Sequence, residues 1–324
     1  MLNIIRPGTN IDFASKRHIF LSLSVVVLIA TCVLFFVRGL NYGIDFSGGA
    51  EIHLSVPKAW DIGKLRKELT AGGVEGLKVQ QIGEPSANEY LVRAHGDEKS
   101  LGTVSGKVNE TLQKTFSPTD FEIKRADVVG PAAGALLRKQ GFLAMFYALL
   151  VILIYVAIRF DSRYAPGAIV ALLHDSLIVL GVFMITQYQF DLTILAAILA
   201  LIGYSNNDTI IVYDRVRETI HMHPEYSIEK AVNKAVNETL GRTIVTSLTT
   251  FMVVSSLWFF GGQVIKNFAF ALMIGVIVGT YSSVFIASSV IIFITNYQKK
   301  RQAFENKKGK KRKQYNVRPE PKLH

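Results

Sequence analysis

The chain has 324 residues, half of them hydrophobic, and a mean hydropathy of +0.30. This composition is too apolar for an ordinary water-soluble protein and indicates a membrane protein. The one cysteine, Cys32, excludes an internal disulfide and a multi-cysteine metal site. Of the formal charge of +11, residues 296–324 carry +9, from eleven Lys/Arg against two glutamates. The basic balance therefore describes a tail rather than a nucleic-acid-binding fold, and no DNA partner is expected.

Six apolar runs, each near the ~20 residues that a helix needs to cross a bilayer, predict six membrane spans. In chain order the predicted spans are residues 19–37, 141–158, 165–185, 192–212, 244–260 and 268–295. Lys16 and Arg17 precede the first run, as basic residues do in a signal peptide. Because its apolar core is too long and no A-x-A-like site follows, we predict a retained anchor.

Lys and Arg in the short connections predict the orientation, because cytoplasmic loops are enriched in them. They lie in the N-terminal segment 1–18, between the second and third spans, in the loop 213–243 and in the tail 296–324. The connections on the opposite side contain only Lys266. Both termini are therefore predicted to be cytoplasmic, and the insert 38–140 is predicted to face outward.

The insert 38–140 has the pattern of a small soluble α+β domain. Alternating segments such as "AEIHLSV" and "EYLVRAH" predict strands. The segment "DIGKLRKELTAGG" predicts a helix that Asp61 caps and two glycines end. A second helix and a final strand, "FEIKRADVV", complete the order β-α-β-β-α-β, which is that of the ferredoxin-like split motif.

A glycine-rich motif, "GIDFSGGAEIHL", follows the first span directly. It contains Gly43, Asp45, Phe46, Gly48 and Gly49. Its glycines permit positive φ or a close backbone approach. The spacing is not that of a dinucleotide or phosphate loop, and we predict no cofactor, no metal site and no catalytic residues. Work done by this protein would therefore draw on an ion gradient or on a partner.

The fourth span contains polar residues that are costly in hydrocarbon. Asp208 follows Asn206 and Asn207 about five residues from the cytoplasmic end of the span. A central aspartate costs about 2.5–3.5 kcal/mol, so it should face the bundle interior or water and have a partner. Arg242 begins the fifth span at a similar depth, which allows a contact with Asp208 but does not require one.

The third span carries His174 and Asp175 close to its middle. A histidine can gain or lose a proton near neutral pH, so this pair is a second candidate for proton exchange. Polar residues inside a membrane also hold helices together structurally. For His174 and Asp175 both interpretations stand, whereas the asparagines beside Asp208 favour a functional role there.

The sixth span has small residues at every fourth position: Ala271, Gly275, Gly279, Ser283 and Ala287. The pair Gly275 and Gly279 forms a G-x-x-x-G pattern, which predicts close packing against a helix of this chain or of another. The tail beyond this span is charged and lacks apolar periodicity, which favours disorder and attraction to anionic lipids. Contact with RNA is an alternative for the tail.

Four of these segments together resemble a known family. "NYGIDFSGGAEI", "LLHDSLI", "IGYSNNDTIIVYDRVRE" and "GRTIVTSLTT" are similar to motifs of the SecF branch of the SecD/SecF protein-export family, within the RND transporter superfamily. The resemblance runs from about residue 38 to residue 297. It implies a multi-pass protein of the bacterial inner membrane whose insert is periplasmic.

The resemblance also implies partners and an activity. SecD would supply a matching six-span half, and the pair would assist the SecYEG channel, with YajC and YidC as further candidate partners. The pair would use the proton-motive force to promote translocation of unfolded preproteins. An exporter of small molecules or lipids, or a scaffold for SecYEG that transports nothing, are the alternatives.

The family's functional acid and arginine correspond to Asp208 and Arg242, and Asn207 and His174 occupy matching motif positions. The implied mechanism is a proton relay in which protonation of Asp208 removes its attraction to Arg242 and shifts the bundle. Asn206 stands where the family usually has an aliphatic residue, so sodium in place of protons stays open.

Overall fold

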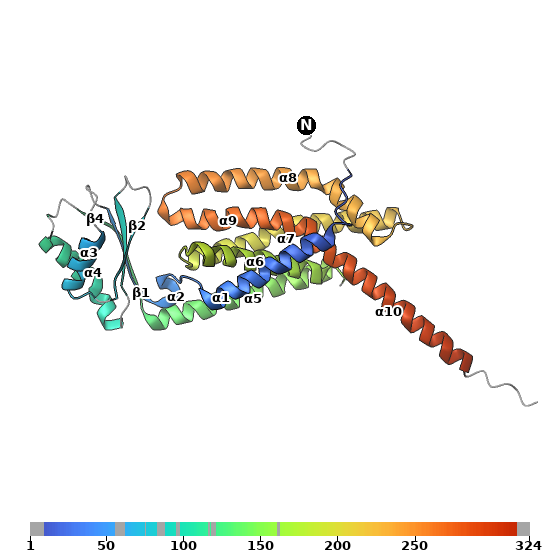
Figure 1. The fold of residues 1–324 in the computed structure, drawn as a ribbon, viewed down its shortest axis with the longest axis horizontal. Coiled ribbons are helices and arrows are strands. Elements are labelled where there is room, and N and C mark those ends of the chain that lie inside the picture. Colours follow the sequence, from blue (N-terminus) through green and yellow to red (C-terminus); the bar gives the residue numbers. More distant parts are fainter. Residues whose placement is uncertain are drawn as a thin grey trace, which may run out of the picture.

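The computed structural model describes residues 10–55, 62–74, 76–82, 88–94, 98–115, 117, 121–160 and 163–315. Among these, a long helical bundle carries a small sheet domain at one end (Figure 1). Six stretches of the described residues are helical, long and apolar enough to cross a membrane: α1 (Arg17–Val37), α5 (Pro131–Arg159), α6 (Ala165–Thr186), α7 (Leu192–Met222), α8 (Ile228–Phe260) and Ile265–Gln302. The last stretch combines α9 (Gln263–Tyr281), a π-helical segment η2 (Ser282–Ala287) and the start of α10 (Ser288–Tyr315).

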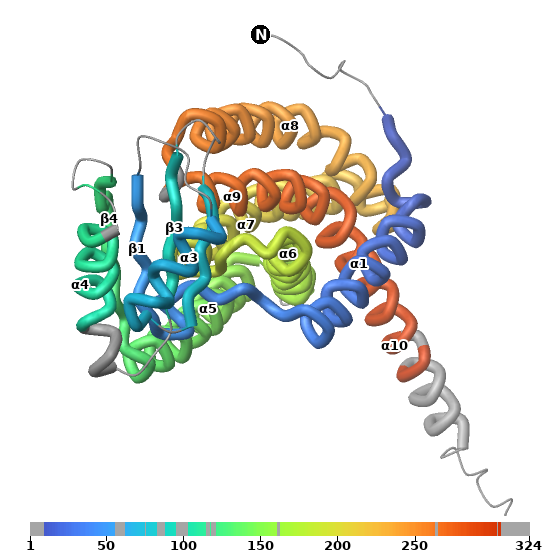
Figure 2. The backbone as a smooth tube through the Cα atoms, turned by 60° about the vertical axis from the view of Figure 1, so that its left-hand side comes forward, coloured from blue at the N-terminus to red at the C-terminus, as the bar shows by residue number. Residues whose placement is uncertain are grey.

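The bundle has a buried centre and an exposed outer set of helices. In α6, α7 and the last span, 56% of the apolar window is buried, against 11% in α1, α5 and α8. The three outer helices surround the centre in Figure 2. Their exposed apolar side chains are therefore left for lipid or for another protein chain.

Several helices extend beyond the apolar spans that the sequence predicts. Most of 213–243, expected as a loop, is helical, because α7 continues to Met222 and α8 begins at Ile228. The hydroxyl of Ser227 caps α8 by accepting a hydrogen bond from the backbone N–H of Lys230. Hydropathy marks only the length of a helix that lies in hydrocarbon, so it misses these polar extensions.

The tail also differs from its prediction. Its backbone continues α10 as a helix to Tyr315 and leaves the bundle (Figure 1). Lys, Arg, Gln and Glu are good helix formers, and Arg301 pairs with Glu305 one turn later. Propensity therefore sustains this helix without an apolar face.

The sheet domain has the predicted ferredoxin-like order. Its elements are β1 (Gly49–Ser55), α3 (Ile62–Ala71), β2 (Lys78–Ile82), β3 (Glu89–Ala94), α4 (Glu98–Thr115) and β4 (Glu122–Val129). The strands are antiparallel and lie in the order β2-β3-β1-β4. The fold class expected from the sequence, six membrane helices with this α+β domain between the first two, is confirmed.

The two faces of the sheet have different surroundings, because successive strand residues point to opposite sides. On one face Ile52 lies opposite Val92, and both belong to an apolar cluster with α3 and α4 that includes Leu65 and Leu112. The alternate residues are Glu51, His53 and Ser55 in β1 and Glu89, Leu91 and Arg93 in β3, so all but Leu91 are polar. The sheet therefore has one apolar face under its helices and one polar face.

Two glycines join the sheet domain to the bundle. Gly48 and Gly49 have φ values of +73° and +141°, which L side chains rarely adopt. A Cβ on Gly48 would lie 2.7 Å from the Cα of Pro131, where α5 begins, and one on Gly49 would lie 2.8 Å from the carbonyl oxygen of Ala94. The glycine motif thus lets β1, β3 and α5 meet without space for a side chain.

Gly49→Ala should destabilise this junction by about 1–3 kcal/mol, because the alanine adopts a strained φ and contacts the Ala94 carbonyl. Gly106→Ala is the matched control: Gly106 lies in α4 with open space around its Cα, so alanine should stabilise that helix by roughly 0.5–1 kcal/mol. Limited proteolysis of the full chain in increasing urea measures both effects. Equal resistance of the two variants would contradict the prediction.

Candidate functional site

Asp208 lies inside the bundle and is held by two hydroxyl groups. Its side chain is on α7 and is 9% exposed. Thr243 of α8 donates a hydrogen bond of 2.6 Å to Oδ1, and Ser283 of η2 donates one of 2.5 Å to Oδ2. Three separate helical segments therefore meet at this carboxyl group, and each oxygen atom has one donor.

Arg242 and Asn207, the other residues expected at this point, lie apart from the carboxylate. Arg242 precedes Thr243 on α8 but is exposed, and its guanidinium makes no ion pair within the described part of the chain. Asn207 is also exposed, on the outer face of α7. Its neighbour Asn206 is buried, and its Oδ1 has no hydrogen-bond partner among the described residues.

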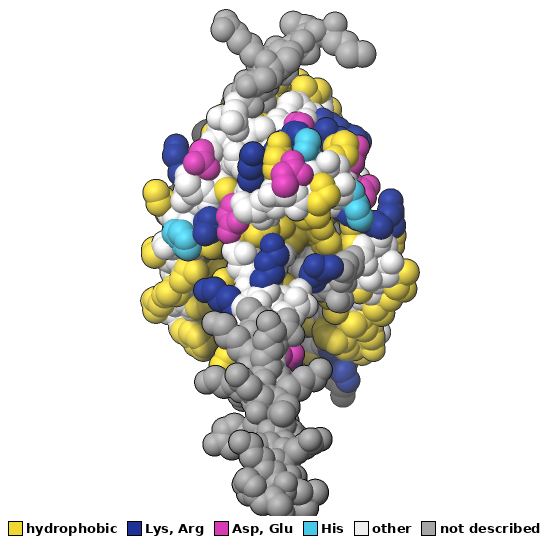
Figure 3. Space-filling model, turned by 90° about the vertical axis from the view of Figure 1, so that its right-hand side faces the viewer, with side chains coloured by type: hydrophobic (Ala, Val, Ile, Leu, Met, Phe, Trp, Pro, Cys, Tyr) yellow, Lys and Arg dark blue, Asp and Glu magenta, His cyan; other side chains and the backbone are white. Residues whose placement is uncertain are grey.

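Arg242 lines a hollow at the end of the bundle away from the sheet domain. The hollow has a volume of about 620 Å³, and its charged lining residues are Arg159, Asp214, Arg215, Arg217, Glu218 and Arg242. Figure 3 views this end of the molecule, where Lys, Arg, Asp and Glu side chains gather. Thr239 also lines the hollow and lies one helical turn before Thr243 on α8, so the hollow lies about one turn from the hydroxyl that holds Asp208.

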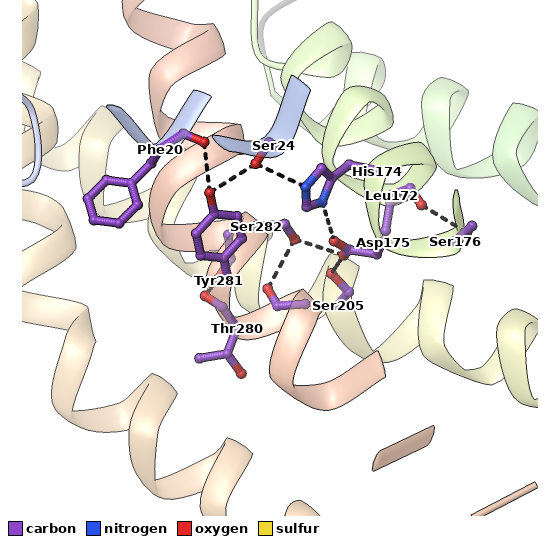
Figure 4. A network of polar contacts seen from close by, with 12 residues as sticks. Phe20, Ser24, Leu172, His174, Asp175, Ser176, Ser205, Thr280, Tyr281 and Ser282 are labelled. Atoms are coloured by element: carbon purple, nitrogen blue, oxygen red, sulfur yellow. Dashed lines mark hydrogen bonds and ion pairs between the residues drawn. The ribbon is translucent and has the colours of Figure 1, made fainter. Parts of the chain in front are cut away.

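A second buried carboxylate, Asp175, lies on α6. Its Oδ2 accepts hydrogen bonds from Ser205 of α7 at 2.6 Å and from Ser282 of η2 at 2.7 Å. Its Oδ1 lies 3.1 Å from Nδ1 of His174. Figure 4 shows these side chains converging from the central helices. His174 and Asp175, 2% and 1% exposed, are thus brought together by the structure.

The network continues from His174 to α1. Nε2 of His174 lies 3.1 Å from the hydroxyl of Ser24, which is 2.9 Å from the hydroxyl of Tyr281 (Figure 4). Tyr281 donates to the backbone carbonyl of Phe20. A neutral His174 can accept from Ser24, and a protonated one can donate to it once that hydroxyl turns toward Tyr281. The hydroxyl of Ser24 can therefore act as donor or as acceptor toward Nε2 of His174.

The π-helical segment connects the two carboxylates. Its first two residues are Ser282, which bonds Asp175, and Ser283, which bonds Asp208. Short π-helical segments within α-helices are frequent at functional sites. A rotation of this segment would change the partners of both carboxylates at once.

The glycine motif contacts the start of α7. Oδ2 of Asp45 accepts from the backbone N–H of Leu192 at 3.0 Å, and the ring of Phe46 stacks on Phe190. The backbone N–H of Gly43 donates to the Phe190 carbonyl.

Asp191 caps α7 at the same place. Burial raises the pKa of the Asp191 carboxyl group, and the nearby Asp45 carboxylate raises that pKa further. The motif and the helix that carries Asp208 are therefore directly bonded.

The polar face of the sheet also contacts the connection between α6 and α7. Nε2 of Gln189 donates to Glu51 of β1 at 2.8 Å, and Nε of Arg93 of β3 donates to the same carboxylate oxygen at 2.8 Å. Arg93 also donates to Oε1 of Gln189. This three-residue cluster and the glycine motif hold the sheet domain at the same end of α7.

Comparison with known proteins identifies the family. Residues 107–297 match the family model for the C-terminal region of the protein export membrane proteins SecD and SecF, and residues 33–56 match the SecD/SecF GG motif. The chain belongs to the SecD/SecF family. The SecF translocase subunit of Calditerrivibrio nitroreducens is 43% identical over 302 residues, which cover 92% of this chain and 99% of that protein. The SecF subunit of Pseudomonas aeruginosa is 40% identical over 290 residues, or 90% of this chain and 93% of that protein.

Solved structures of this family have the same fold. The crystal structure of SecDF from Thermus thermophilus matches 89% of this chain with a TM-score of 0.80 and 30% identity. A second SecDF structure, in a super-membrane-facing form, matches 93% with a TM-score of 0.67 and 32% identity. This chain spans 39% and 41% of those two SecDF chains.

Within this SecD/SecF family member, the small-residue face of the last span lies against α7. A Cβ on Gly275 would come within 2.6 Å of the side chain of Leu201, and one on Gly279 within 3.1 Å of Ser205. The two glycines thus let the last span approach close enough for Ser282 to reach Asp175.

Sequence reasoning missed the residues that hold the carboxylates. The sequence gives no sign of Thr243, Ser282 or Ser24 as partners; Ser205 is predicted only to share a helix face with Asp208, and Ser283 only to be a small residue of the sixth span. Hydroxyl residues are common in membrane helices and usually bond their own backbone, so residue type alone does not distinguish these. The signal that could have found them is their position in spans that pack against a helix with a buried aspartate.

Ser282→Ala should lower the stability of the bundle by about 1–2 kcal/mol, because it leaves a buried carboxylate with one donor fewer between helices. Ser289→Ala is the control, because Ser289 is also buried but donates to the Phe285 carbonyl one turn earlier in the same span. Thermal unfolding in detergent compares the two. A loss in Ser289→Ala as large as that in Ser282→Ala would contradict the assigned contact.

Proposed function

We propose that this chain is the SecF-type half of a protein translocase that pairs with a SecD subunit and promotes preprotein transport with the energy of an ion gradient. The observation that carries the proposal is Asp208, a buried carboxyl group held by hydroxyls beside an arginine-lined hollow. The names of the SecF relatives and of the SecDF structures support the proposal that SecD is the partner.

The hydroxyl partners suit an ion step in which Asp208 changes its charge. An ionised carboxylate accepts from both Thr243 and Ser283. A protonated carboxyl must donate one hydrogen bond, and a hydroxyl can turn to accept it, whereas an arginine cannot. Asp208 can therefore gain a proton without leaving a buried polar atom unsatisfied.

Arg242 acts on the ionised form in this proposal. It approaches Asp208 when the carboxylate is charged and returns to the hollow when a proton neutralises it. The hollow supplies the water-filled route to the cytoplasm, and the proton enters from the opposite side between this chain and SecD. The buried oxygens of Asn206 and Thr209, which have no partner among the described residues, leave sodium as the alternative coupling ion.

The surface that SecD covers is the exposed face of α7. This face carries Ala196, Ala200, Gly203 and Asn207, and small residues let a second helix approach closely. The amide of Asn207 has no hydrogen-bond partner in the described residues, and a lipid tail offers none. A polar group of the partner subunit would satisfy it.

Movement of α7 would reach the sheet domain through its first turn. Asp45 bonds the backbone of Leu192, and Gln189 bonds Glu51 and Arg93 of the sheet. A displacement of α7 at Asp208 therefore pulls on β1 and β3. The outer domain, placed in the periplasm with both termini in the cytoplasm, draws the emerging preprotein away from SecYEG, with YajC and YidC as accessory partners.

Two other functions make different predictions. An exporter of small molecules or lipids would need its own substrate and would not depend on SecYEG. A scaffold for SecYEG would carry no ion and would tolerate loss of the carboxylate. Ion flux through reconstituted complex, and the identity of the co-purifying partner, distinguish these from the translocase.

Asp208→Asn should abolish gradient-dependent export while the complex still assembles, because asparagine keeps the shape and cannot exchange a proton. Asp127→Asn is the control, since Asp127 lies in β4 of the sheet domain, away from the bundle, and pairs with Arg125. Export into inverted membrane vesicles is measured with a proton gradient and, separately, with a sodium gradient. Full export by Asp208→Asn would exclude this role. Export by the wild-type chain with a sodium gradient alone, and none with a proton gradient, would identify sodium as the coupling ion.

Asp45→Ala should reduce export several-fold while ion flux persists, because it cuts the bond between the glycine motif and α7 but leaves Asp208 intact. Asp127→Ala is its control: Asp127 lies in β4 of the same domain and pairs with Arg125 on its own strand. Flux and export are measured in the same proteoliposomes. Parallel loss of both in Asp45→Ala would show that the motif is needed for folding rather than for coupling.

A further inference from the structure

An apolar groove runs along the outside of the bundle near the sheet domain, apart from both carboxylates. Its volume is about 290 Å³. Residues of α1, α5 and α6 form its walls, among them Phe35, Phe36, Phe142, Met145, Leu180 and Met184. Only Leu195 of α7 and no residue of α8 contributes to it. The groove is therefore separate from the exposed face of α7 that carries Asn207.

The groove opens to the surroundings at the depth of lipid tails. It extends from Thr31 to Leu40, past the end of α1 at Val37, so its inner part lies about 10 Å below the helix end at the helical rise per residue. Phe36 and Phe142, on its two sides, are 86% and 59% exposed. In a bilayer these rings border hydrocarbon, and an acyl chain has direct access to the groove.

One cation lies at the rim of the groove. Arg138 of α5 lines it and is exposed, and within the described residues its guanidinium has no hydrogen bond, ion pair or aromatic partner. The hydroxyl of Tyr42, a second lining residue, likewise has no hydrogen bond among the described residues. Arg138 lies about two turns into α5 and Tyr42 lies just after the end of α1, both toward the end of the bundle that carries the sheet domain. A phosphate group could accept hydrogen bonds from both donors, since guanidinium forms strong paired hydrogen bonds with phosphate oxygens.

We infer that this groove binds one anionic phospholipid, with part of an acyl chain between α1 and α5 and its phosphate on Arg138 and Tyr42. The apolar walls admit hydrocarbon and exclude water, but they do not choose among lipids, because lipid tails are as apolar as the groove. The positive charge of Arg138 selects lipids with an anionic headgroup. Phe46 and Phe190, which stack where the glycine motif meets α7, also line the groove. The bound lipid therefore packs against the junction between the bundle and the sheet domain.

The test uses the full chain in lipid nanodiscs with a photoactivatable group on the acyl chain of phosphatidylglycerol, compared with phosphatidylcholine of identical chains. Mass spectrometry locates the adducts. The expected result is several-fold more adducts with phosphatidylglycerol in peptides that contain residues 32–36 and 142–145. Equal labelling by the two lipids would reduce the groove to ordinary bilayer contact and overturn the proposal.

Three variants separate the charge from the groove. Arg138→Ala should lower phosphatidylglycerol labelling to the phosphatidylcholine level, whereas Lys139→Ala, the neighbouring cation that does not line the groove, should leave it unchanged. Cys32→Trp fills the groove with Arg138 intact and should reduce labelling by both lipids. Wild-type labelling in Arg138→Ala, or in Cys32→Trp, would contradict the proposal.

Discussion

The burial of two carboxylates inside a membrane bundle is the constraint on which the rest of this structure depends. Hydrocarbon offers them neither water nor counter-ions, so the protein must supply donors from neighbouring helices. Asp208 and Asp175 each receive two hydroxyl groups from other helical segments. These bonds require the last span to approach α7 closely, and Gly275 and Gly279 provide the space. Helix packing and the chemistry of the site are therefore one arrangement.

The same arrangement explains how a small chemical event can act over the length of the molecule. α7 begins at the glycine motif, carries the buried carboxylate along its length and ends beside the basic hollow. Its first turn is bonded to the sheet domain, and its carboxylate is bonded to α8 and η2. A change of charge at one residue alters bonds to two helices. In the proposed mechanism, the continuous α7 would transmit the resulting displacement to the sheet.

Hydropathy and strand periodicity were enough to predict six spans and the β-α-β-β-α-β domain, because both patterns follow from burial. They were also enough to single out Asp208, since an acid inside an apolar run is rare. The partners of Asp208 lie 35 and 75 residues away in the sequence. The residue type of a serine or threonine does not predict which helix its hydroxyl will contact. The polar ends of α7, α8 and α10 were missed for a related reason: helical structure continues after hydropathy has fallen.

The central claim is that the carboxyl group at position 208 takes up and releases a cation while it stays inside the bundle. Infrared difference spectroscopy of the reconstituted protein between high and low pH measures this directly. The account predicts a carboxylic-acid carbonyl band that appears at low pH, persists in Asp127→Asn and is absent in Asp208→Asn. If the band is as strong in Asp208→Asn as in the wild type, with protons and with sodium alike, the central claim is contradicted.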